Sequence, residues 1–209
     1  SLHKILLDSN VGAIISTYMS SKQKLIHFDD LIKINNSEII NILGRYGFEC
    51  SIFNTRSIKH LFNRKNDELL KAIAKYKFGY ELFTYMYCLY VIQDCHCIES
   101  VINEYRDICV SYTKNTCIKR LFLQVIARHP DAIQIYDTLG ITQYNYHYAI
   151  EACMVGNINT LEYLIENSQI LGRIYECPQL LTICVINSDI ECFNYLIQKQ
   201  IRPSYGIAI

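Results

Sequence analysis

One short phrase recurs along this chain, and its spacing constrains the fold more than any other feature. It occurs most clearly at Asn157–Ile165 and Asp189–Ile197, where a polar residue precedes an amphipathic helical pattern. Weaker copies begin at Asn10, Asn36, Asn66, Cys97 and Asp131. Successive copies start about 30 residues apart, a period typical of stacked helical units, because one helix pair needs neighbours to cover its apolar face. The sequence therefore predicts an all-α solenoid of helix pairs with about six to seven degenerate units.

Each copy of the phrase is expected to be the second of two antiparallel helices, entered through a polar turn. The clearest units lie between residues 121 and 200. In one, Gly156 and Asn157 separate helices over Tyr148–Val155 and Ile158–Asn167, since glycine suits a helix end and asparagine caps the next start. The other expected helices are Leu2–Leu7, Val11–Met19, Leu31–Ile34, Ile39–Tyr46, Ile58–Phe62, Leu69–Tyr76, Leu82–Ile92, Ile98–Tyr105, Leu121–Ala127, Ala132–Leu139, Pro178–Ile186 and Ile190–Gln200. Residues 1–209 are predicted to form a single repeat domain.

Composition agrees with an ordered helical protein. Hydrophobic residues make up 51% of the chain and charged residues 19%, which argues against disorder. Only 3 Pro and 8 Gly are present, so helix breakers are few. The formal net charge of zero argues against nucleic-acid binding, which needs a surplus of Lys and Arg. We therefore expect neither a nucleic acid nor a membrane as partner.

The expected location is the cytoplasm, with the nucleus as the alternative. No apolar run reaches the length of a membrane helix, and the N-terminus lacks the pattern of a secretory signal. The first residue is not Met, so we expect processing or a missing N-terminal segment. Most of the 10 cysteines lie inside helical apolar patterns, where Cys88, Cys153, Cys184 and Cys192 take the place of Ala, Val or Leu, which indicates free thiols in a reducing compartment.

Residues Ala149–Ile165 resemble the core of an ankyrin repeat, with small residues ending the first helix, a Gly-polar turn and an apolar second helix. Leu180–Ile197 resembles the next copy. The family's Thr-Pro-Leu-His motif is replaced by His147–Ile150 and Gln179–Thr182, so any β-hairpin fingers are expected to be shortened or irregular. Another type of helical-pair solenoid is the alternative within the same class.

The abundance of Ile, Asn and Tyr makes these repeats similar to the degenerate ankyrin-like repeats of large cytoplasmic DNA viruses, such as poxviruses and African swine fever virus. That resemblance implies a host-interacting protein, often one that blunts innate immunity. The F-box-like tail of many poxviral members is not evident in residues 201–209, so recruitment of a ubiquitin ligase is not expected.

No pattern in the sequence indicates catalysis or a bound cofactor. Cys95-His96-Cys97 is the most metal-like cluster, but its spacing differs from a CxxC pair, and the two thiols should point in different directions. There is no HExxH motif and no Gly-rich phosphate loop. We expect no enzyme activity, cofactor, metal or small-molecule substrate.

Two groups of aromatic residues are candidate partner contacts. Tyr80 and Tyr87 belong to a dense aromatic run, for which packing inside the stack is the alternative. The second group enters the sixth unit and consists of Tyr144, Tyr146, His147 and Tyr148. Tyrosine combines apolar area with a polar tip, which suits interfaces, and repeat proteins bind through their extended concave surface.

The leading functional hypothesis is a non-enzymatic protein-interaction module that binds a host protein and occludes its normal contacts. The alternative is a structural subunit or homodimer, because the terminal repeat stays apolar where a polar cap is expected.

Overall fold

The structure is a computed structural model that describes residues 25–27, 30, 32–33, 35–51, 55–76, 81–167 and 179–201. Of these described residues 74% are helical, and strands are limited to two segments of three residues each. The predicted all-α class is therefore confirmed in its coarse form, as a chain of helices with a repeat-like topology. The ankyrin type of stacking stays a prediction.

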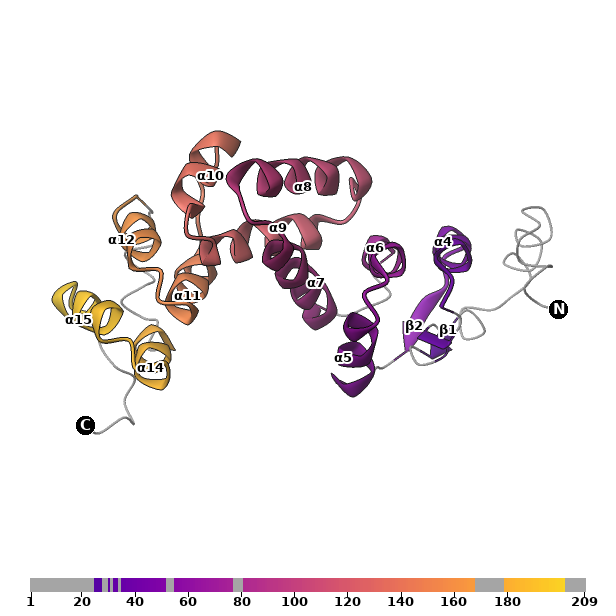
Figure 1. The fold of residues 1–209 in the computed structure, drawn as a ribbon, viewed down its shortest axis with the longest axis horizontal. Helices are drawn as coiled ribbons and strands as arrows, with labels where there is room; N and C mark the ends of the chain where they lie inside the picture. The colour runs from indigo at the N-terminus through magenta and orange to yellow at the C-terminus, as the bar shows by residue number, and fades with distance from the viewer. Residues whose placement is uncertain are drawn as a thin grey trace. The chain divides into compact units, whose positions relative to one another are not determined.

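Eleven α-helices, a 3₁₀ helix and two strands make up the described chain (Figure 1). In chain order they are β1 (Leu25–His27), α4 (Ser37–Arg45), β2 (Glu49–Ser51), α5 (Thr55–Asn63), α6 (Asp67–Lys75), α7 (Glu81–Asp94), α8 (Ile98–Ser111), α9 (Thr116–Val125), η2 (Ile126–Arg128), α10 (Ala132–Leu139), α11 (Tyr146–Met154), α12 (Ile158–Asn167), α14 (Gln179–Ile186) and α15 (Ile190–Gln198).

The predicted repeat starts coincide with the starts of the second helices. Helices α4, α6, α8, α10, α12 and α15 each begin one residue after a predicted start. The copy at Asn10, with the helices expected at Leu2–Leu7 and Val11–Met19, lies outside the described residues. The periodic pattern thus locates six helix starts, because a polar cap followed by a 3.6-residue apolar period is a local signal.

Side-chain capping explains why four of these helices, α4, α6, α12 and α15, begin where they do. The side-chain oxygens of Asn36, Asn66, Asn157 and Asp189 each accept a hydrogen bond from the main-chain N–H three residues later, at 3.1 to 3.3 Å. A residue of positive φ precedes each of these caps, and only one of the four is glycine. They are Asn35 (47°), Lys65 (49°), Gly156 (68°) and Ser188 (56°). The turns at Lys65, Gly156 and Ser188 each connect the two helices of a pair.

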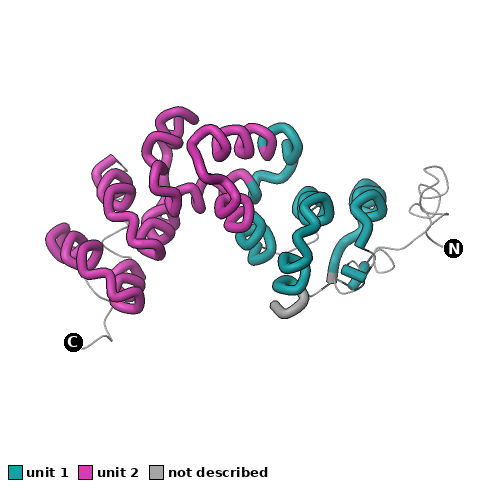
Figure 2. Tube along the Cα trace, in the orientation of Figure 1, with its two compact units in different colours: residues 1–87, 109–118 teal, residues 88–108, 119–209 magenta. Residues whose placement is uncertain are grey.

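The chain divides into two compact units (Figure 2). Unit 1 comprises Ser1–Tyr87 with Cys109–Ile118, and unit 2 comprises Cys88–Ile108 with Lys119–Ile209. The division runs through helices α7, α8 and α9. The single domain expected over residues 1–209 stays a prediction.

The core of unit 1 comes from branched apolar side chains of helices α4, α5 and α6 and from aromatic side chains of the first half of α7. Helices α4 and α6 pack directly on each other. Gly44 of α4 permits a close approach, because a Cβ at this position would lie 2.0 Å from the ring of Tyr76. Asn115 adds a long-range tie by donating from Nδ2 to the main-chain oxygen of Ala74 over 2.9 Å.

A short β-bridge in unit 1 was not expected from the sequence. Strands β1 and β2 pair in parallel, with Leu25 opposite Glu49 and His27 opposite Ser51. The pairing is not a β-hairpin, since α4 lies between the two strands in the chain. Three-residue segments carry too little periodicity to be separated from loop by pattern, and only the tertiary fold brings them together.

In unit 2 consecutive helix pairs lie side by side. Helix α11 packs on α14, and α12 packs on α15, so the α11–α12 pair is followed directly by the α14–α15 pair (Figure 1). Turn asparagines link these neighbours. Asn157 donates from Nδ2 to the main-chain oxygens of Ala127 and His129, at 3.2 and 2.9 Å. One pair later, Asn187 donates to those of Cys153 and Met154, at 3.4 and 3.1 Å.

Candidate functional site

The loop that enters α11 is held in place by a group of four tyrosines in unit 2. Tyr144 lies at its centre, with ring centroids 5.3 Å from Tyr136, 6.0 Å from Tyr148 and 5.9 Å from Tyr163. Its hydroxyl donates to the main-chain oxygen of Ile141 over 2.6 Å. Edge-to-face packing of the Tyr144 ring therefore fixes this loop against helices α10, α11 and α12.

Burial raises the pKa of three tyrosines in this group. It raises the pKa of Tyr136 well above its usual value, and the Tyr136 hydroxyl donates to the main-chain oxygen of Leu123 over 2.9 Å. Burial also raises the pKa of Tyr148 to about 12, although the nearby charge of Arg120 opposes this, and it raises the pKa of Tyr144. Neutral phenols at physiological pH can pack and hydrogen-bond, so the group acts as a scaffold for the loop.

Two rings beside this scaffold remain accessible. Tyr146 and His147 are half-buried at the start of α11, with ring centroids 3.9 Å apart and planes tilted by 34°. Asn145 fixes their backbone, because its Oδ1 accepts from the His147 N–H over 3.0 Å. Thr142 and Gln143, just before them, are exposed. We call Thr142, Gln143, Tyr146 and His147 the loop surface.

The structure separates the six predicted contact residues. Tyr146 and His147 lie on the loop surface, whereas Tyr148 is buried and Tyr144, itself half-buried, packs against its aromatic neighbours. Tyr80 lies outside the described residues. Tyr87 is buried in unit 1, where its hydroxyl lies 3.4 Å from that of Tyr112, so its proposed partner contact is corrected to a core position. Burial on both sides of α7 was the alternative that the sequence left open.

A buried ion pair in unit 2 was missed by the sequence analysis. Glu151 of α11 is almost fully buried, and its Oε2 lies 2.6 Å from Nε of Arg128. Its Oε1 accepts from Nε2 of Gln124 over 2.9 Å. All three side chains come from packed helices, so the network ties η2 and α9 to α11. A lone carboxylate inside the apolar run Tyr148–Cys153 was the available signal.

The cysteines of the Cys95-His96-Cys97 cluster face different environments. Cys95 is buried and Cys97 is exposed. Burial raises the pKa of Cys95 to about 11, whereas the hydrogen bond between Cys97 Sγ and Ser100 Oγ, 2.9 Å long, lowers the pKa of Cys97. Within the described residues, no group of three or more His, Cys, Asp and Glu side chains is placed to hold a metal ion.

Large apolar side chains are exposed on the last helix pair. Val185 and Ile186 end α14, and Ile190 and Ile197 lie on α15. The sequence pattern alone gave no signal for this exposure, because residues at equivalent apolar positions of the preceding pair, such as Cys153 and Ile165, are buried. No helix among the described residues is long and apolar enough to cross a membrane.

No family model matches the chain, and no curated protein or solved structure matches it either.

Proposed function

We propose that this chain is a non-enzymatic binding protein that contacts a partner protein through the loop surface. The observation that carries the proposal is the rigid support under that surface. Tyr144 is held by three aromatic neighbours and by its own hydrogen bond to Ile141, while Tyr146 and His147 stay accessible beside it. A loop that is already ordered loses little entropy when it binds, so a few contacts give useful affinity.

The chemistry of the loop surface favours a protein as the partner. It combines two aromatic rings with the exposed polar side chains of Thr142 and Gln143. Tyrosine is enriched at the centres of protein interfaces, where it supplies apolar area and a hydrogen-bonding tip. The chain's net charge of zero offers no general attraction for nucleic acid. The mechanism would be occlusion, in which the bound partner loses access to its normal contacts.

The proposed partner is a host protein, and the proposed origin is a large cytoplasmic DNA virus. The support is the resemblance of Ala149–Ile165 and Leu180–Ile197 to degenerate ankyrin repeats of such viruses. Under this proposal the protein acts in the host cytoplasm or nucleus and dampens an innate immune response. The ankyrin type of stacking is part of the same proposal.

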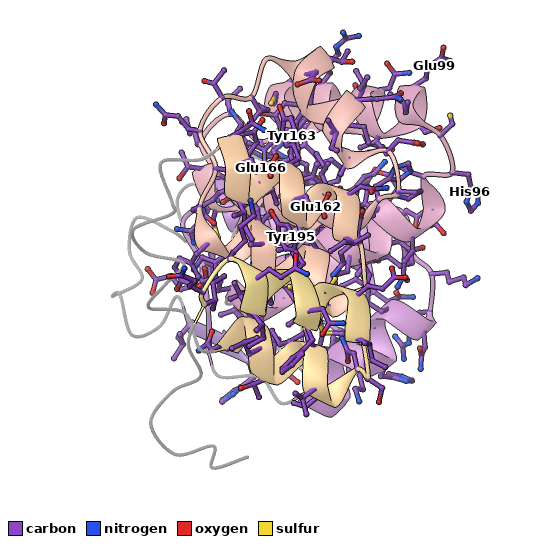
Figure 3. All side chains as sticks on the ribbon, turned by 90° about the vertical axis from the view of Figure 1, so that its left-hand side faces the viewer. His96, Glu99, Glu162, Tyr163, Glu166 and Tyr195 are labelled. Atoms are coloured by element: carbon purple, nitrogen blue, oxygen red, sulfur yellow. The ribbon has the colours of Figure 1, made fainter. Side chains whose placement is uncertain are left out.

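The test is affinity capture from host-cell lysate with the full chain, followed by crosslinking mass spectrometry. A Tyr146→Ala/His147→Ala variant should lose the captured protein, because it removes both accessible rings. His96→Ala is the matched control, since His96 is exposed and projects away from the helices (Figure 3). We expect crosslinks from the partner to residues at 141–147. A captured protein that both variants retain, with crosslinks elsewhere, would contradict the proposal.

A further inference from the structure

The helix pairs of unit 2 that follow η2 carry an excess of negative charge. Their described residues, 129–167 and 179–198, contain no Lys and no Arg. The carboxylates in the same ranges are Asp131, Asp137, Glu151, Glu162, Glu166, Asp189 and Glu191. The net charge of the whole chain is nevertheless zero, because Lys and Arg outnumber Asp and Glu over residues 1–128. A surface with one sign of charge attracts a partner of the opposite sign.

Two of these carboxylates already have a structural role. Glu151 is buried against Arg128, with 2.6 Å between Oε2 and Nε. Asp189 caps α15 through Oδ1. Three carboxylates remain that lie within the second helices α10 and α12 and are exposed or half-buried, namely Asp137, Glu162 and Glu166.

These three carboxylates lie beside two tyrosines of the repeated phrase. Tyr163 of α12 donates from its hydroxyl to Oδ1 of Asp137 on α10, over 3.0 Å. Tyr195 of α15 lies next to Glu162 and Glu166 (Figure 3). Helix α12 packs on both α10 and α15, so these residues are connected across three packed helices. We call Asp137, Glu162, Tyr163, Glu166 and Tyr195 the acidic stripe.

The chain's own Lys199 shows which chemical group the acidic stripe receives. Its Nζ lies 3.2 Å from Oε1 of Glu166 and 5.4 Å from the centroid of the Tyr195 ring. A carboxylate attracts a cation by its charge, and the face of a tyrosine ring attracts it by the ring quadrupole. The hydrogen bond to Glu166 also raises the pKa of Lys199, which favours the charged ammonium. One end of the acidic stripe thus already holds a primary ammonium group.

The other end of the acidic stripe presents the same two kinds of group. Asp137 is exposed, and Tyr163 is half-buried beside it. Among the described residues, neither Asp137 nor Glu162 forms an ion pair with a Lys or Arg side chain. The acidic stripe therefore carries three carboxylates against one ammonium, and its charge favours the binding of further cations.

We propose that the acidic stripe binds a Lys- and Arg-rich segment of a partner protein. The basic side chains of that segment pair with the three carboxylates and lie against the rings of Tyr163 and Tyr195. Long basic side chains suit this surface, because their stems cover aromatic area while their charged heads reach the carboxylates. The acidic stripe shares no residue with the loop surface, so this interaction goes beyond the proposed function and does not depend on it.

The test titrates the full chain into fluorescein-labelled octalysine and follows fluorescence anisotropy. Wild type should bind saturably, with a Kd that rises as salt is added, because salt screens the charges. Glu162→Gln/Glu166→Gln should raise the Kd about tenfold, since it removes two of the three carboxylates and keeps the side-chain size. Glu99→Gln/Asp107→Asn is the matched control, because both residues are exposed on α8 and Glu99 lies apart from the acidic stripe (Figure 3). It should bind as wild type does.

A lysine variant separates binding at the acidic stripe from a general attraction between opposite charges. Lys199→Ala removes the ammonium that lies on Glu166 and Tyr195, so octalysine should bind about threefold more tightly. Arg106→Ala also removes one positive charge, at an exposed position of α8, and should leave the Kd unchanged. Equal effects of Lys199→Ala and Arg106→Ala would contradict the proposal.

Absence of saturable binding by wild type would overturn the proposal, and so would equal Kd values for Glu162→Gln/Glu166→Gln and its control. Self-association of wild type at low salt, seen by light scattering and lost in the same variant, would assign the acidic stripe to a second copy instead. Thermal unfolding of the variants should match wild type, and Asp137→Asn replaces the double variant if that one unfolds. Tyr146→Ala/His147→Ala should keep the wild-type Kd for octalysine, so a failure of the loop surface is distinguishable from a failure here.

Discussion

The side chain of Asn157 donates a hydrogen bond from Nδ2 to the main-chain oxygen of His129 over 2.9 Å, and so joins two consecutive helix pairs of unit 2. The same residue caps α12, because its Oδ1 accepts from the Thr160 N–H. Asn157 therefore both caps α12 and binds the turn of the preceding helix pair. The residue that marks the helix start in the sequence thus also contributes to the stacking of the helix pairs.

Replacing Asn157 by alanine should lower the free energy of unfolding by about 2 kcal/mol, because both the cap and the link to the preceding turn are lost. Asn157→Asp should retain the cap but lose the donor, and should cost about half as much. Asn159→Ala, at an exposed position of the same helix, is the control and should change stability by less than about 0.5 kcal/mol. Urea denaturation of the three variants measures this, and equal losses for Asn157→Ala and Asn159→Ala would contradict the prediction.

At two glycines of positive φ, the stability cost of backbone strain can be measured separately from the cost of steric crowding. Gly156 has φ 68°, and a Cβ there would lie 2.9 Å from Asp189 Oδ2, whereas Gly140 has φ 65° and open space around the same position. Gly140→Ala should cost about 1 kcal/mol from backbone strain alone. Gly156→Ala should cost about 1 kcal/mol more, because Asp189 must move while it caps α15. Chemical denaturation measures which variant loses more free energy of unfolding. A larger loss for Gly140→Ala than for Gly156→Ala would contradict the prediction.

The buried and the exposed ion pairs of unit 2 should respond differently to mutation. Glu151→Ala leaves Arg128 and Gln124 without their acceptor and should cost about 3 kcal/mol. Glu166→Ala removes the pair between Glu166 and Lys199, which spans 3.2 Å at the surface, and should cost far less than Glu151→Ala. Unfolding measured at low and high salt tests both. The Glu166 effect should shrink with salt, and a comparable loss for the two variants would be inconsistent with the burial of Glu151.

Thiol reactivity should distinguish Cys97 from Cys95. The hydrogen bond to Ser100 lowers the pKa of Cys97, so more of this exposed thiol is thiolate at neutral pH. Burial raises the pKa of Cys95 to about 11, so it stays a protonated thiol there. Iodoacetamide should therefore alkylate Cys97 first, with peptide mass spectrometry as the readout, and Ser100→Ala should slow Cys97 alone. Faster labelling of Cys95 in the native protein would refute this assignment.

The helix starts could be predicted because their causes are local. A capping side chain bonds to an N–H three residues away, and an apolar stripe repeats within one helix, as in α12 and α15. The roles of the tyrosines could not be predicted in the same way. Tyr146 and Tyr148 are two residues apart in one helix, yet Tyr148 is buried against Tyr136 and Tyr146 is accessible. Only the packing of α10 against α11 and α12 decides between them.

By itself, the amino-acid sequence determined the helical class, the repeat period and the residue at which each described second helix begins. These depend on hydrogen bonds and apolar contacts between residues close in the chain. The tertiary structure decided that Glu151 is buried with Arg128, that Tyr87 belongs to a core, that β1 pairs with β2, and that Val185 and Ile197 are exposed where Cys153 and Ile165 are buried. These outcomes depend on which distant segment covers each residue, and the same apolar pattern is compatible with a covered or an open face.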